Sequence, residues 1–404
     1  MEIHKVKYMK VAQITPGRFH HFDLARQLHK RGILDKVYTG FPLWALDNHN
    51  EIKEIGVDRV CTYPWLQTPY MFYTKHLLKF ERAKIIKSYW ALKNLTALDS
   101  FVSRRPLTYD VLIAQSGCGL KSGRRLKQHG GIYVCDRGSS HILHQTNVLR
   151  EEYDSRGLKY EAVSAAHIQR ELEEYEAADY ITVPSNYARQ TFVDYGVPSS
   201  KIKVVPYGVD LSRFYPVAQP QDDQLDILFV GGVTLRKGLP YLLEAFKSLK
   251  MPKKKLWLIG SIDWSMRKYF DENGVPEHVE ILGHVEQSRL PEFMSRAHMM
   301  VLPSLEEGLA LVQAQALACG CPVVSTYACG GEDLFRDGIE GFIVDAKDSD
   351  ALARRITQLA TDKKLRRDMA NSAVEKVKTM GGWNRYGEIM VDFLNGLSFR
   401  NKRV

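Results

Sequence analysis

The stretch "VLPSLEEGLALVQAQALACGCPVVS", residues 301–325, predicts a strand–helix–strand unit. "VLPS" favours the end of a strand, "LALVQAQALACG" a helix that stops at Gly320, and "CPVVS" the next strand. Glu307 and Gly308 stand where this helix begins. Buried strands joined through a helix pair in parallel, and such sheets bind ligands beyond the carboxyl ends of their strands. The stretch therefore predicts an α/β fold with a site around Glu307.

The same alternation of strands and helices extends over the 404 residues. A first series runs from "MKVAQIT", residues 9–15, to "IKVVPYGVD", residues 202–210. Residues 211–224 lose the periodicity and gain Pro, Gln and Asp, as in a linker. A second series begins at "LDILFVGG", residues 225–232. We therefore expect two Rossmann-like, doubly wound parallel-sheet domains.

The composition favours a globular protein, because 45% of the residues are hydrophobic and 25% are charged. No run of about 18 apolar residues occurs, so we expect no membrane-spanning helix. The first residues are basic and then turn into a strand pattern, which is not typical of a signal peptide. The six cysteines form no CxxC pair and have no zinc-type spacing. We therefore expect reduced thiols and a cytoplasmic location.

The net charge of +9 is unevenly distributed. Residues 1–150 carry 24 Lys and Arg against 11 Asp and Glu, a net charge of +13, and residues 151–404 carry 32 against 36, a net charge of −4. Within the basic part, "KHLLKFERAKIIKSYWALKNL", from Lys75 to Leu95, mixes cations with apolar and aromatic residues at helical spacing. This pattern suits a helix that lies on an anionic membrane surface. The protein would then be a peripheral membrane protein at the inner face of the membrane. The alternative is a solvated helix whose other face is core.

"FVGGVTLRKG", residues 229–238, ends a predicted strand and precedes a helix. Gly231 and Gly232 allow a close approach of the backbone. Arg236 and Lys237 follow beside the helix start, where a diphosphate is attracted both by the cations and by the helix dipole. The alternative is a solvated helix start.

Two glutamines interrupt the apolar helix that follows Glu307. The N–H groups near Ala310 and Leu311 stand free for phosphate oxygens if this is a helix start. Gln315 comes eight residues after Glu307, about two turns into the helix, where it can face the same cleft. In that case Glu307 accepts from sugar hydroxyls and Gln315 contacts a ribose. In the alternative, Gln313 and Gln315 are polar positions on a core helix.

Three segments together resemble the retaining glycosyltransferases of family four, which have the GT-B fold. They are residues 201–216, residues 229–246 and residues 279–344. The resemblance is strong over about residues 180–360 and weaker before them. It implies that the two domains face a central cleft, with residues 1–207 binding the acceptor and residues 208–383 binding the donor. It also implies that "WNRYGEIMVDFLNGL" begins a terminal helix, about residues 384–404, that crosses back to the first domain.

The resemblance also implies the roles of several residues. The family's mark is a glutamate, seven residues and a second glutamate, and this chain has Glu307 and Gln315 at those places. Glu307 is then expected to meet the donor sugar, Gln315 the ribose, and Arg236 and Lys237 the diphosphate. The sequence departs from the family at Gly232, where many relatives have arginine, and at Leu309–Ala310, where Phe-Gly is usual. The expected donor-binding residues are Gly231, Gly232, Arg236, Lys237, Gly283, His284, Glu307, Gly308, Leu309, Ala310, Leu311 and Gln315.

Two loops of the first domain complete the expected site. "CDRGSSHILHQ" follows a strand, and in this family such a loop closes over donor sugar and acceptor. We expect Asp136 or His141 to serve catalysis there, together with Glu307, Arg236 and Lys237. The alternative is that Asp136 only anchors its loop through Ser139 and Ser140. The expected acceptor-binding residues are Gly17, Arg18, His20, His21 and Arg137.

The chemistry follows from charge. Breaking a sugar–nucleotide bond leaves negative charge on the diphosphate, which Arg236, Lys237 and the helix start can stabilise without a metal. We expect no cofactor besides the nucleotide-sugar, and we interpret Asp348, Ser349 and Asp350 as a helix cap rather than a metal motif. The resemblance implies a retaining hexosyltransferase that uses a UDP- or GDP-sugar. Its acceptor is a glycan or lipid-linked molecule in polysaccharide or glycolipid biosynthesis.

Other classes of protein were weighed against this hypothesis. A Rossmann oxidoreductase needs GxGxxG after the first strand, and "TPGRFHHFD" lacks it. A nucleotide-sugar epimerase or a phosphorylase can share the GT-B fold. A nucleic-acid-binding protein explains the charge of +13 but not the donor-site residues, so we expect no nucleic acid as a partner.

Overall fold

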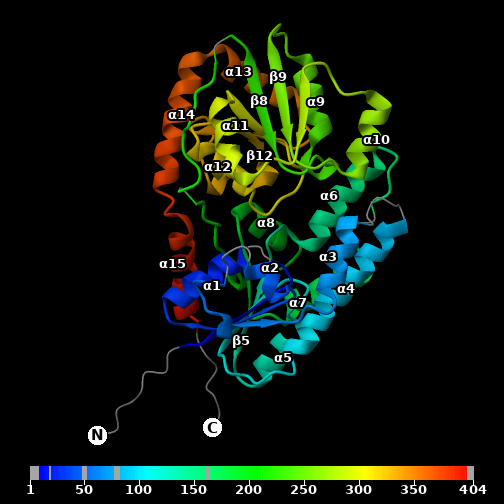
Figure 1. Cartoon of the computed structure of the whole chain (residues 1–404), viewed down its shortest axis with the longest axis vertical. Helices are drawn as coiled ribbons and strands as arrows, with labels where there is room; N and C mark the ends of the chain where they lie inside the picture. Colours follow the sequence, from blue (N-terminus) through cyan, green and yellow to red (C-terminus); the bar gives the residue numbers. More distant parts are fainter. Residues whose placement is uncertain are drawn as a thin grey trace.

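The structure is a computed structural model that describes residues 9–17, 20–47, 52–76, 82–160, 163–210, 212–221 and 223–397. Two parallel sheets, one from residues 11–204 and one from residues 225–344, have helices packed against them. Figure 1 shows the two domains one above the other, the first in blue to green at the bottom. The two predicted series of strands and helices are confirmed. The described part of residues 211–224 contains neither helix nor strand.

The first sheet has the strand order β3-β2-β1-β4-β5-β6-β7, with every pairing parallel. Its central strands are almost wholly buried, which explains their short apolar runs without alternation. Their carboxyl ends meet at one edge, where Thr15 Oγ1 donates to Gln115 Oε1 (3.1 Å) and Gln115 pairs with Asp136. The strands are β1 (Val11–Thr15), β2 (Leu34–Thr39), β3 (Val60–Thr62), β4 (Val111–Gln115), β5 (Ile132–Asp136), β6 (Tyr180–Val183) and β7 (Ile202–Val204).

The helices of the first domain are anchored by buried carboxylates. Glu174 accepts from the backbone N–H groups of Gly117, Gly119 and Leu120, and Asp99 accepts from the next two, so both cap α5. These contacts fasten α4 and α7 to α5. The helices are α1 (His21–Lys30), α2 (Leu43–Asp47), α3 (Gln67–His76), α4 (Arg82–Val102), α5 (Leu120–Gln128), α6 (Ile142–Asp154), α7 (Ala165–Ala177) and α8 (Asn186–Asp194), with 3-10 turns η1 (Val57–Arg59) and η2 (Ser199–Lys201).

The second sheet has the order β10-β9-β8-β11-β12-β13 and is also parallel throughout. Its strands are β8 (Leu225–Val230), β9 (Lys254–Ile259), β10 (Val279–Gly283), β11 (Met299–Leu302), β12 (Val323–Thr326) and β13 (Gly341–Val344). Its helices are α9 (Leu239–Ser248), α10 (Trp264–Asn273), α11 (Leu290–Arg296), α12 (Leu311–Ala318), α13 (Ser349–Thr361) and α14 (Lys363–Lys378), and its 3-10 turns are η3 (Leu235–Lys237), η4 (Gln287–Arg289), η5 (Tyr327–Cys329) and η6 (Gly331–Asp333).

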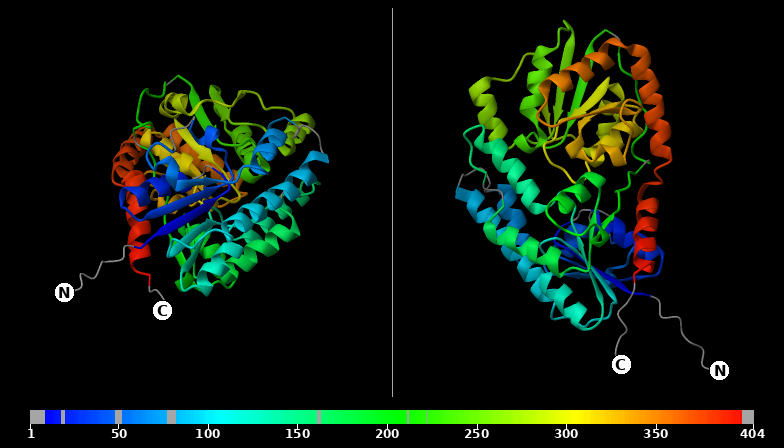
Figure 2. Two further views of the ribbon diagram at one scale, coloured as in Figure 1. Left: turned by 60° about the horizontal axis from the view of Figure 1, so that its bottom comes forward. Right: turned by 180° about the vertical axis from the view of Figure 1, so that it is seen from behind.

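The last helix returns to the first domain, as predicted. α15 (Gly382–Asn395) begins two residues before the expected start, and residues 398–404 lie outside the described residues. Met390 and Leu394 of α15 share a hydrophobic core with Val11 and Phe22. Figure 2 shows α14 and α15, in orange and red, running along one side of both domains.

A second element joins the domains. α6 leaves the edge of the first sheet and extends along the second domain (Figure 1). Tyr153 at its end belongs to the core of the second domain, and Glu152 Oε2 accepts from the Tyr241 hydroxyl of α9 (2.7 Å). The loop after β5 is therefore held between the two sheets.

The basic segment from Lys75 to Leu95 falls on α3 and α4. Residues 77–81 between these helices lie outside the described residues, as do the side chains of residues 74–76 and 82–88. Beyond them, Leu95 is buried and Tyr89 is 63% exposed, so the described part of α4 has both a core face and an open face. Within the described ranges, none of the helices combines the length and apolarity needed to cross a bilayer.

One smaller prediction is confirmed. Asp348 caps α13, and its side chain accepts from the backbone N–H of Ala351 (2.7 Å). All six cysteines are unpaired.

Candidate active site between the two sheets

Glycines bring the loops after β8, β9 and β10 together. A Cβ on Gly260, after β9, would lie 1.8 Å from the carbonyl oxygen of Gly231, after β8. Gly260 N–H donates to the carbonyl of Gly283 at the end of β10 (2.7 Å). Gly231 and Gly283 therefore occupy one edge of the sheet, while His284 next to Gly283 is exposed.

Gly238 lets the turn η3 approach the end of β11. Its φ is 67°, and a Cβ there would lie 1.9 Å from the carbonyl oxygen of Pro303. Only glycine combines this left-handed conformation with so close an approach. Thr234 Oγ1 accepts from Lys237 N–H (3.3 Å), and the Arg236 carbonyl accepts from Leu305 N–H (2.9 Å). These contacts bring both cations onto the loop that carries Glu307.

Three of the predicted catalytic residues lie together. Lys237 Nζ contacts Glu307 Oε1, which also accepts from Ser304 Oγ (3.1 Å). An Arg236 guanidinium nitrogen lies 3.6 Å from Glu307 Oε2. Glu307 is 8% exposed. Both cations are therefore paired with carboxylates, and a diphosphate entering here would compete for them.

Sequence reasoning missed Glu306, which has more polar contacts than its neighbour. Its side chain is fully buried and accepts from Ser139 Oγ (2.6 Å), from Ser140 N–H (3.2 Å) and Oγ (2.6 Å), and from Gln145 Nε2 (2.9 Å). Arg236 forms an ion pair with it at 3.0 Å. Burial alone would raise the pKa of Glu306, but Arg236 and the three donor side chains outweigh burial and lower the pKa to about 2. Glu306 thus ties the loop after β11 to the first domain.

Backbone contacts beside Glu306 are equally close. A Cβ on Gly308 would lie 2.1 Å from the carbonyl oxygen of Gly138. The Gly308 carbonyl accepts from Ser185 Oγ (2.5 Å), and Asp333 accepts from the backbone N–H of Asn186 (2.6 Å). Gly308 is therefore part of the contact between the domains.

The two glutamines of α12 lie in different environments. Gln313 is fully buried, and its Nε2 donates to the carbonyls of Cys329 (3.0 Å) and Ala310 (3.3 Å), so it is a core residue. Gln315 is half-buried and has no side-chain hydrogen bond to any described residue. It lies one turn after Leu311 on the same half-buried face. Its contact with a ribose stays a prediction.

One expectation about the helix start needs correction. The Ala310 N–H is not free, because it donates to the carbonyl of Cys329 (3.2 Å). The side chains of Leu309 and Ala310 are 7% and 5% exposed and belong to the hydrophobic cores. Leu311 is the first residue of α12, so an anion at this end would meet the helix there.

In the first domain, Asp136 at the end of β5 collects three side chains. Its Oδ2 lies 2.7 Å from His20 Nε2 and 2.9 Å from His21 Nε2, and its Oδ1 accepts from Thr182 Oγ1 (2.6 Å). Burial would raise the pKa of Asp136, but the two histidines hold it well below its ordinary value. Asp136 does not anchor its loop through Ser139 and Ser140, because both hydroxyls donate to Glu306.

The other residues predicted near the acceptor differ in accessibility. Gly17 lies at the end of β1, where its carbonyl accepts from Thr15 Oγ1 (3.0 Å), and Arg18 lies outside the described residues. His20 is half-buried, while burial and the adjacent His20 lower the pKa of His21.

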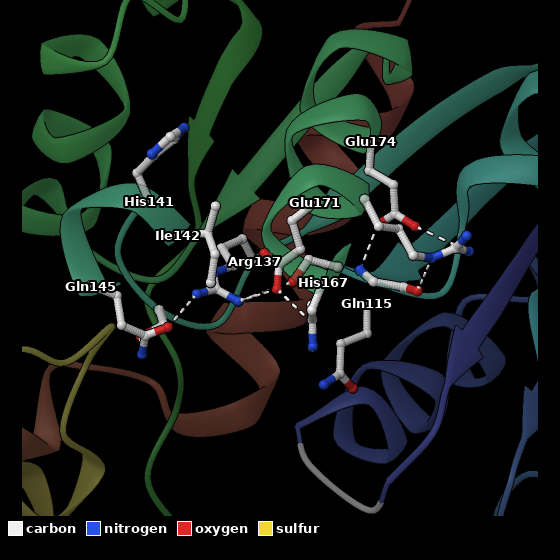
Figure 3. Close-up of polar contacts among 12 residues, drawn as sticks. Gln115, Arg137, His141, Ile142, Gln145, His167, Glu171 and Glu174 are labelled. Atoms are coloured by element: carbon white, nitrogen blue, oxygen red, sulfur yellow. Dashed lines mark hydrogen bonds and ion pairs between the residues drawn. The ribbon is translucent and has the colours of Figure 1, made fainter. Parts of the chain in front are cut away.

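Arg137 has its guanidinium bound within the first domain (Figure 3). It donates to Glu171 Oε1 (2.9 Å), to Gln145 Oε1 (2.8 Å) and to the carbonyl of Ser140 (3.0 Å). Burial would raise the pKa of Glu171, but Arg137 and His167 lower it to about 2. The side chain of Arg137 is 8% exposed, so it shapes the loop after β5 rather than presenting a free cation to an acceptor.

His141 starts the helix α6. Its Nδ1 accepts from Leu143 N–H (3.3 Å), its own N–H donates to Thr191 Oγ1 (2.9 Å), and its ring stacks on Tyr195. Burial, followed by the charge of Arg137, lowers the pKa of His141 to about 4. The structure therefore places His141 as a helix cap, away from the group around Asp136.

Comparison with known proteins gives two family matches that meet within the linker. The model described as "Glycosyltransferase Family 4" matches residues 19–213, and the model described as "Glycosyl transferases group 1" matches residues 214–376. An uncharacterized glycosyltransferase of Methanocaldococcus jannaschii is 28% identical over 95% of this chain and 97% of its own length. A GDP-mannose-dependent alpha-(1-6)-phosphatidylinositol monomannoside mannosyltransferase of Mycolicibacterium smegmatis is 26% identical over 54% of this chain and 63% of its own length.

Solved structures share the fold over nearly the whole chain. Sucrose-phosphate synthase of Thermosynechococcus elongatus superposes with a TM-score of 0.70 at 18% identity, over 96% of this chain and 98% of the other. HepE of Anabaena, in complex with UDP and glucose, superposes with a TM-score of 0.67 at 18% identity, over 96% of this chain and all of the other. The predicted GT-B fold is confirmed.

Proposed function

The chain belongs to the group 1 glycosyltransferases, and we propose that it moves a hexosyl unit from a UDP- or GDP-sugar to an acceptor, retaining the anomeric configuration and using no metal. The observation that supports this most directly is the group of Arg236, Lys237 and Glu307 at the carboxyl edge of the second sheet. Two cations beside a glutamate suit a donor whose diphosphate and sugar must be held at once.

The chemistry needs positive charge at the leaving group. As the bond between the anomeric carbon and the diphosphate breaks, the electron pair stays on the phosphate oxygen. Arg236 and Lys237 neutralise it, and the N-terminus of α12 at Leu311 adds a weaker favourable field. Glu307 accepts from the hydroxyls of the sugar and helps to orient it.

Two comparisons support the class of nucleotide in the proposed donor. One relative is described as GDP-mannose-dependent, and one solved structure of the same fold contains UDP and glucose. Both support a nucleoside-diphosphate sugar as the class of donor, and they leave UDP and GDP as the two candidates.

Donor binding tests this proposal directly. We expect one UDP- or GDP-sugar to raise the melting temperature and to be hydrolysed slowly in the absence of an acceptor. Arg236→Ala or Lys237→Ala should lower turnover by about 2–4 kcal/mol of transition-state stabilisation and reduce the thermal shift. Lys268→Ala is the matched control, because Lys268 is a half-exposed cation of the same domain, on α10. Near-normal turnover in both site variants would exclude the diphosphate role.

We further propose that the acceptor is a glycan or lipid-linked molecule presented at an anionic membrane surface. The first domain exposes large aromatic side chains: Trp44 on α2, Trp65 before α3, Phe72 on α3 and Tyr89 on α4. The charge of +13 lies in the same part of the chain. Aromatic side chains and cations together favour a lipid interface, and a relative acting on a phosphatidylinositol monomannoside agrees with such an acceptor.

Vesicle sedimentation separates the two contributions. The protein should pellet with anionic vesicles at low salt and detach at high salt, and neutralising Lys79, Lys84 and Lys87 should weaken this. Trp65→Ser with Phe72→Ser should weaken binding even at low salt, whereas Val217→Ser in the linker, also exposed, should not. Equal binding to neutral vesicles would contradict the electrostatic part.

A further inference from the structure

The group formed by Asp136, His20 and His21 lies outside the donor site, and its contacts specify a chemical role. Two contacts hold His20 in place. Its Nε2 lies 2.7 Å from Asp136 Oδ2, and its ring packs on the Tyr207 ring with 4.3 Å between the ring centroids. We propose that His20 takes the proton from the attacking hydroxyl of the acceptor, with Asp136 as the residue that positions it. This inference rests on the proposed glycosyl transfer.

The hydrogen bond fixes the tautomer of His20. Both oxygens of the Asp136 carboxylate face donors, Thr182 Oγ1 at Oδ1 and the His20 ring at Oδ2, and an ionised carboxylate only accepts hydrogen bonds. The shared proton therefore resides on His20 Nε2, which leaves the lone pair on Nδ1. Thr182 donates to the other oxygen of Asp136, so the carboxylate cannot turn away. A histidine oriented by a buried carboxylate is the arrangement that general-base catalysis requires.

His20 is the most accessible of the three side chains. The exposed fractions of the side chains are 9% for His20, 5% for Asp136 and 0% for His21. His20 is therefore the member of the group best placed to meet a hydroxyl group. The titratable groups that face it are Asp136 of β5, His21 of α1, Tyr207 after β7 and Tyr386 of α15.

His20 also lies close to the loop that carries Glu307. Its Cε1 is 3.7 Å from the position of a Cβ on Gly138. Gly138 in turn touches Gly308, whose Cβ would lie 2.1 Å from the Gly138 carbonyl oxygen. One glycine backbone therefore separates the imidazole from the residue after Glu307. An acceptor hydroxyl between His20 and the donor sugar would be in reach of both.

The proposed step balances as follows. The acceptor oxygen forms a bond to the anomeric carbon while the bond from that carbon to the diphosphate oxygen breaks. The proton of the acceptor hydroxyl passes to His20 Nδ1, and the electron pair of the broken bond leaves with the nucleoside diphosphate. Asp136 stabilises the imidazolium that results, as a buried carboxylate does.

The distances favour a proton over a metal ion at this group. His20, His21 and Asp136 offer three ligand atoms within 4.8 Å of one another. Two ligands at about 2.1 Å from a tetrahedral ion stand about 3.4 Å apart. The nitrogen–oxygen separations here are 2.7 and 2.9 Å, which is hydrogen-bond spacing. His21 Nε2 lies 2.9 Å from the same Asp136 oxygen, so both imidazoles face one carboxylate oxygen.

Donor hydrolysis, with water as the acceptor, tests the proposal. His20→Gln should lower kcat by 10²-fold or more, the usual range for a general base, with the donor KM and the thermal shift by UDP or GDP unchanged within about twofold. His129→Gln, an exposed histidine on the far end of α5, is the matched control. Normal kcat in His20→Gln would overturn the proposal.

Failure of the proposal and failure of the function are distinguishable. If no UDP- or GDP-sugar raises the melting temperature of the wild type, the proposed function fails. If a donor binds and is hydrolysed but His20→Gln keeps a normal kcat, only the assignment of His20 fails. A measurement on the wild type without substrate does not depend on whether a variant folds. Nitrogen-15 NMR of the wild type should show the His20 ring protonated at Nε2, and the opposite tautomer would refute the proposal. A stoichiometric metal ion that is bound to the wild type and absent from His20→Gln would also refute the proposal, if added Zn²⁺ restored the activity of the variant.

Discussion

Glu306→Gln is the substitution whose effect the structure defines most sharply. The amide oxygen can still accept from the hydroxyls of Ser139 and Ser140, which donate to Glu306 Oε1. The amide NH₂ would face two donors, Gln145 Nε2 and the Arg236 guanidinium, which now meet Oε2. Glu306→Gln therefore loses an ion pair and places donor against donor in a buried position.

The magnitude follows from the pKa. The pKa of Glu306 is held at about 2 instead of its ordinary 4.5. This difference corresponds to about 3 kcal/mol of stability in the ionised form. This value is at the lower end of the free energies that are typical for breaking a buried ion pair. A low value is expected here, because the Arg236 side chain is 36% exposed and would keep its ion pair with Glu307. The apparent melting temperature should fall by about 6–12 °C, at about 2–4 °C per kcal/mol.

The gap between wild type and Glu306→Gln should depend on pH with a defined sign. The folded pKa is depressed, so the contribution is complete above pH 4.5 and is lost as the pH falls toward about 2. At pH 3.5 the gap should be smaller than at pH 7 by about 1 kcal/mol. Scanning calorimetry of both proteins at the two pH values measures this.

A control with a similar interdomain charge sets the baseline. Glu151 on α6 contacts Lys347 of the second domain at 3.0 Å, but 74% of its side chain is exposed. Glu151→Gln should cost less than about 1 kcal/mol. Equal losses in the two variants, or a gap that does not change with pH, would refute the assignment of Glu306 as the tie between the domains.

The remaining predictions concern the donor loops. Gly238→Ala should destabilise by at least about 2 kcal/mol in denaturant titrations, because of its positive φ and the contact with Pro303, whereas Gly232→Ala should stay within about 0.5 kcal/mol, since its Cβ would meet only Thr234 Cγ2 at 3.4 Å. Gln315→Ala should raise the donor KM by about 1–2 kcal/mol in steady-state kinetics, while Gln315→Glu should be tolerated. An unchanged donor KM in Gln315→Ala would mean that Gln315 does not contact the donor and only packs within the domain. Glu307→Gln should reduce turnover more than Gln315→Ala does.

Much of the fold was predictable, because its strands are buried on both faces and contain short apolar runs such as "VLIA", residues 111–114, and "ILFV", residues 227–230. The residue types that follow those strands also predicted the group of Arg236, Lys237 and Glu307, which the structure brings together, and the contact of this group with a donor stays a prediction. Glu306 could not be predicted, because its partners are Ser139, Ser140 and Gln145, about 160 residues away along the chain.

The role of His141 was unpredictable for a related reason. A histidine after a strand looks the same in sequence whether it faces a substrate or caps a helix, and here the environment of Thr191 and Tyr195 decides. The two glutamines also separate only in three dimensions. Gln313 turns toward Cys329 in the core, and Gln315, two residues later, comes to the half-buried face.

The crossing of α15 has a consequence for the order of folding during synthesis. Val11, Phe22 and Leu24 of the first domain share their core with Met390 and Leu394, which follow 366 to 383 residues later in the chain. Chains grow from the N-terminus, and domains usually fold as they emerge. The first domain therefore leaves the ribosome with an apolar face uncovered and is completed only after the whole second domain has been made. Its final stability is acquired last, although its strands are translated first.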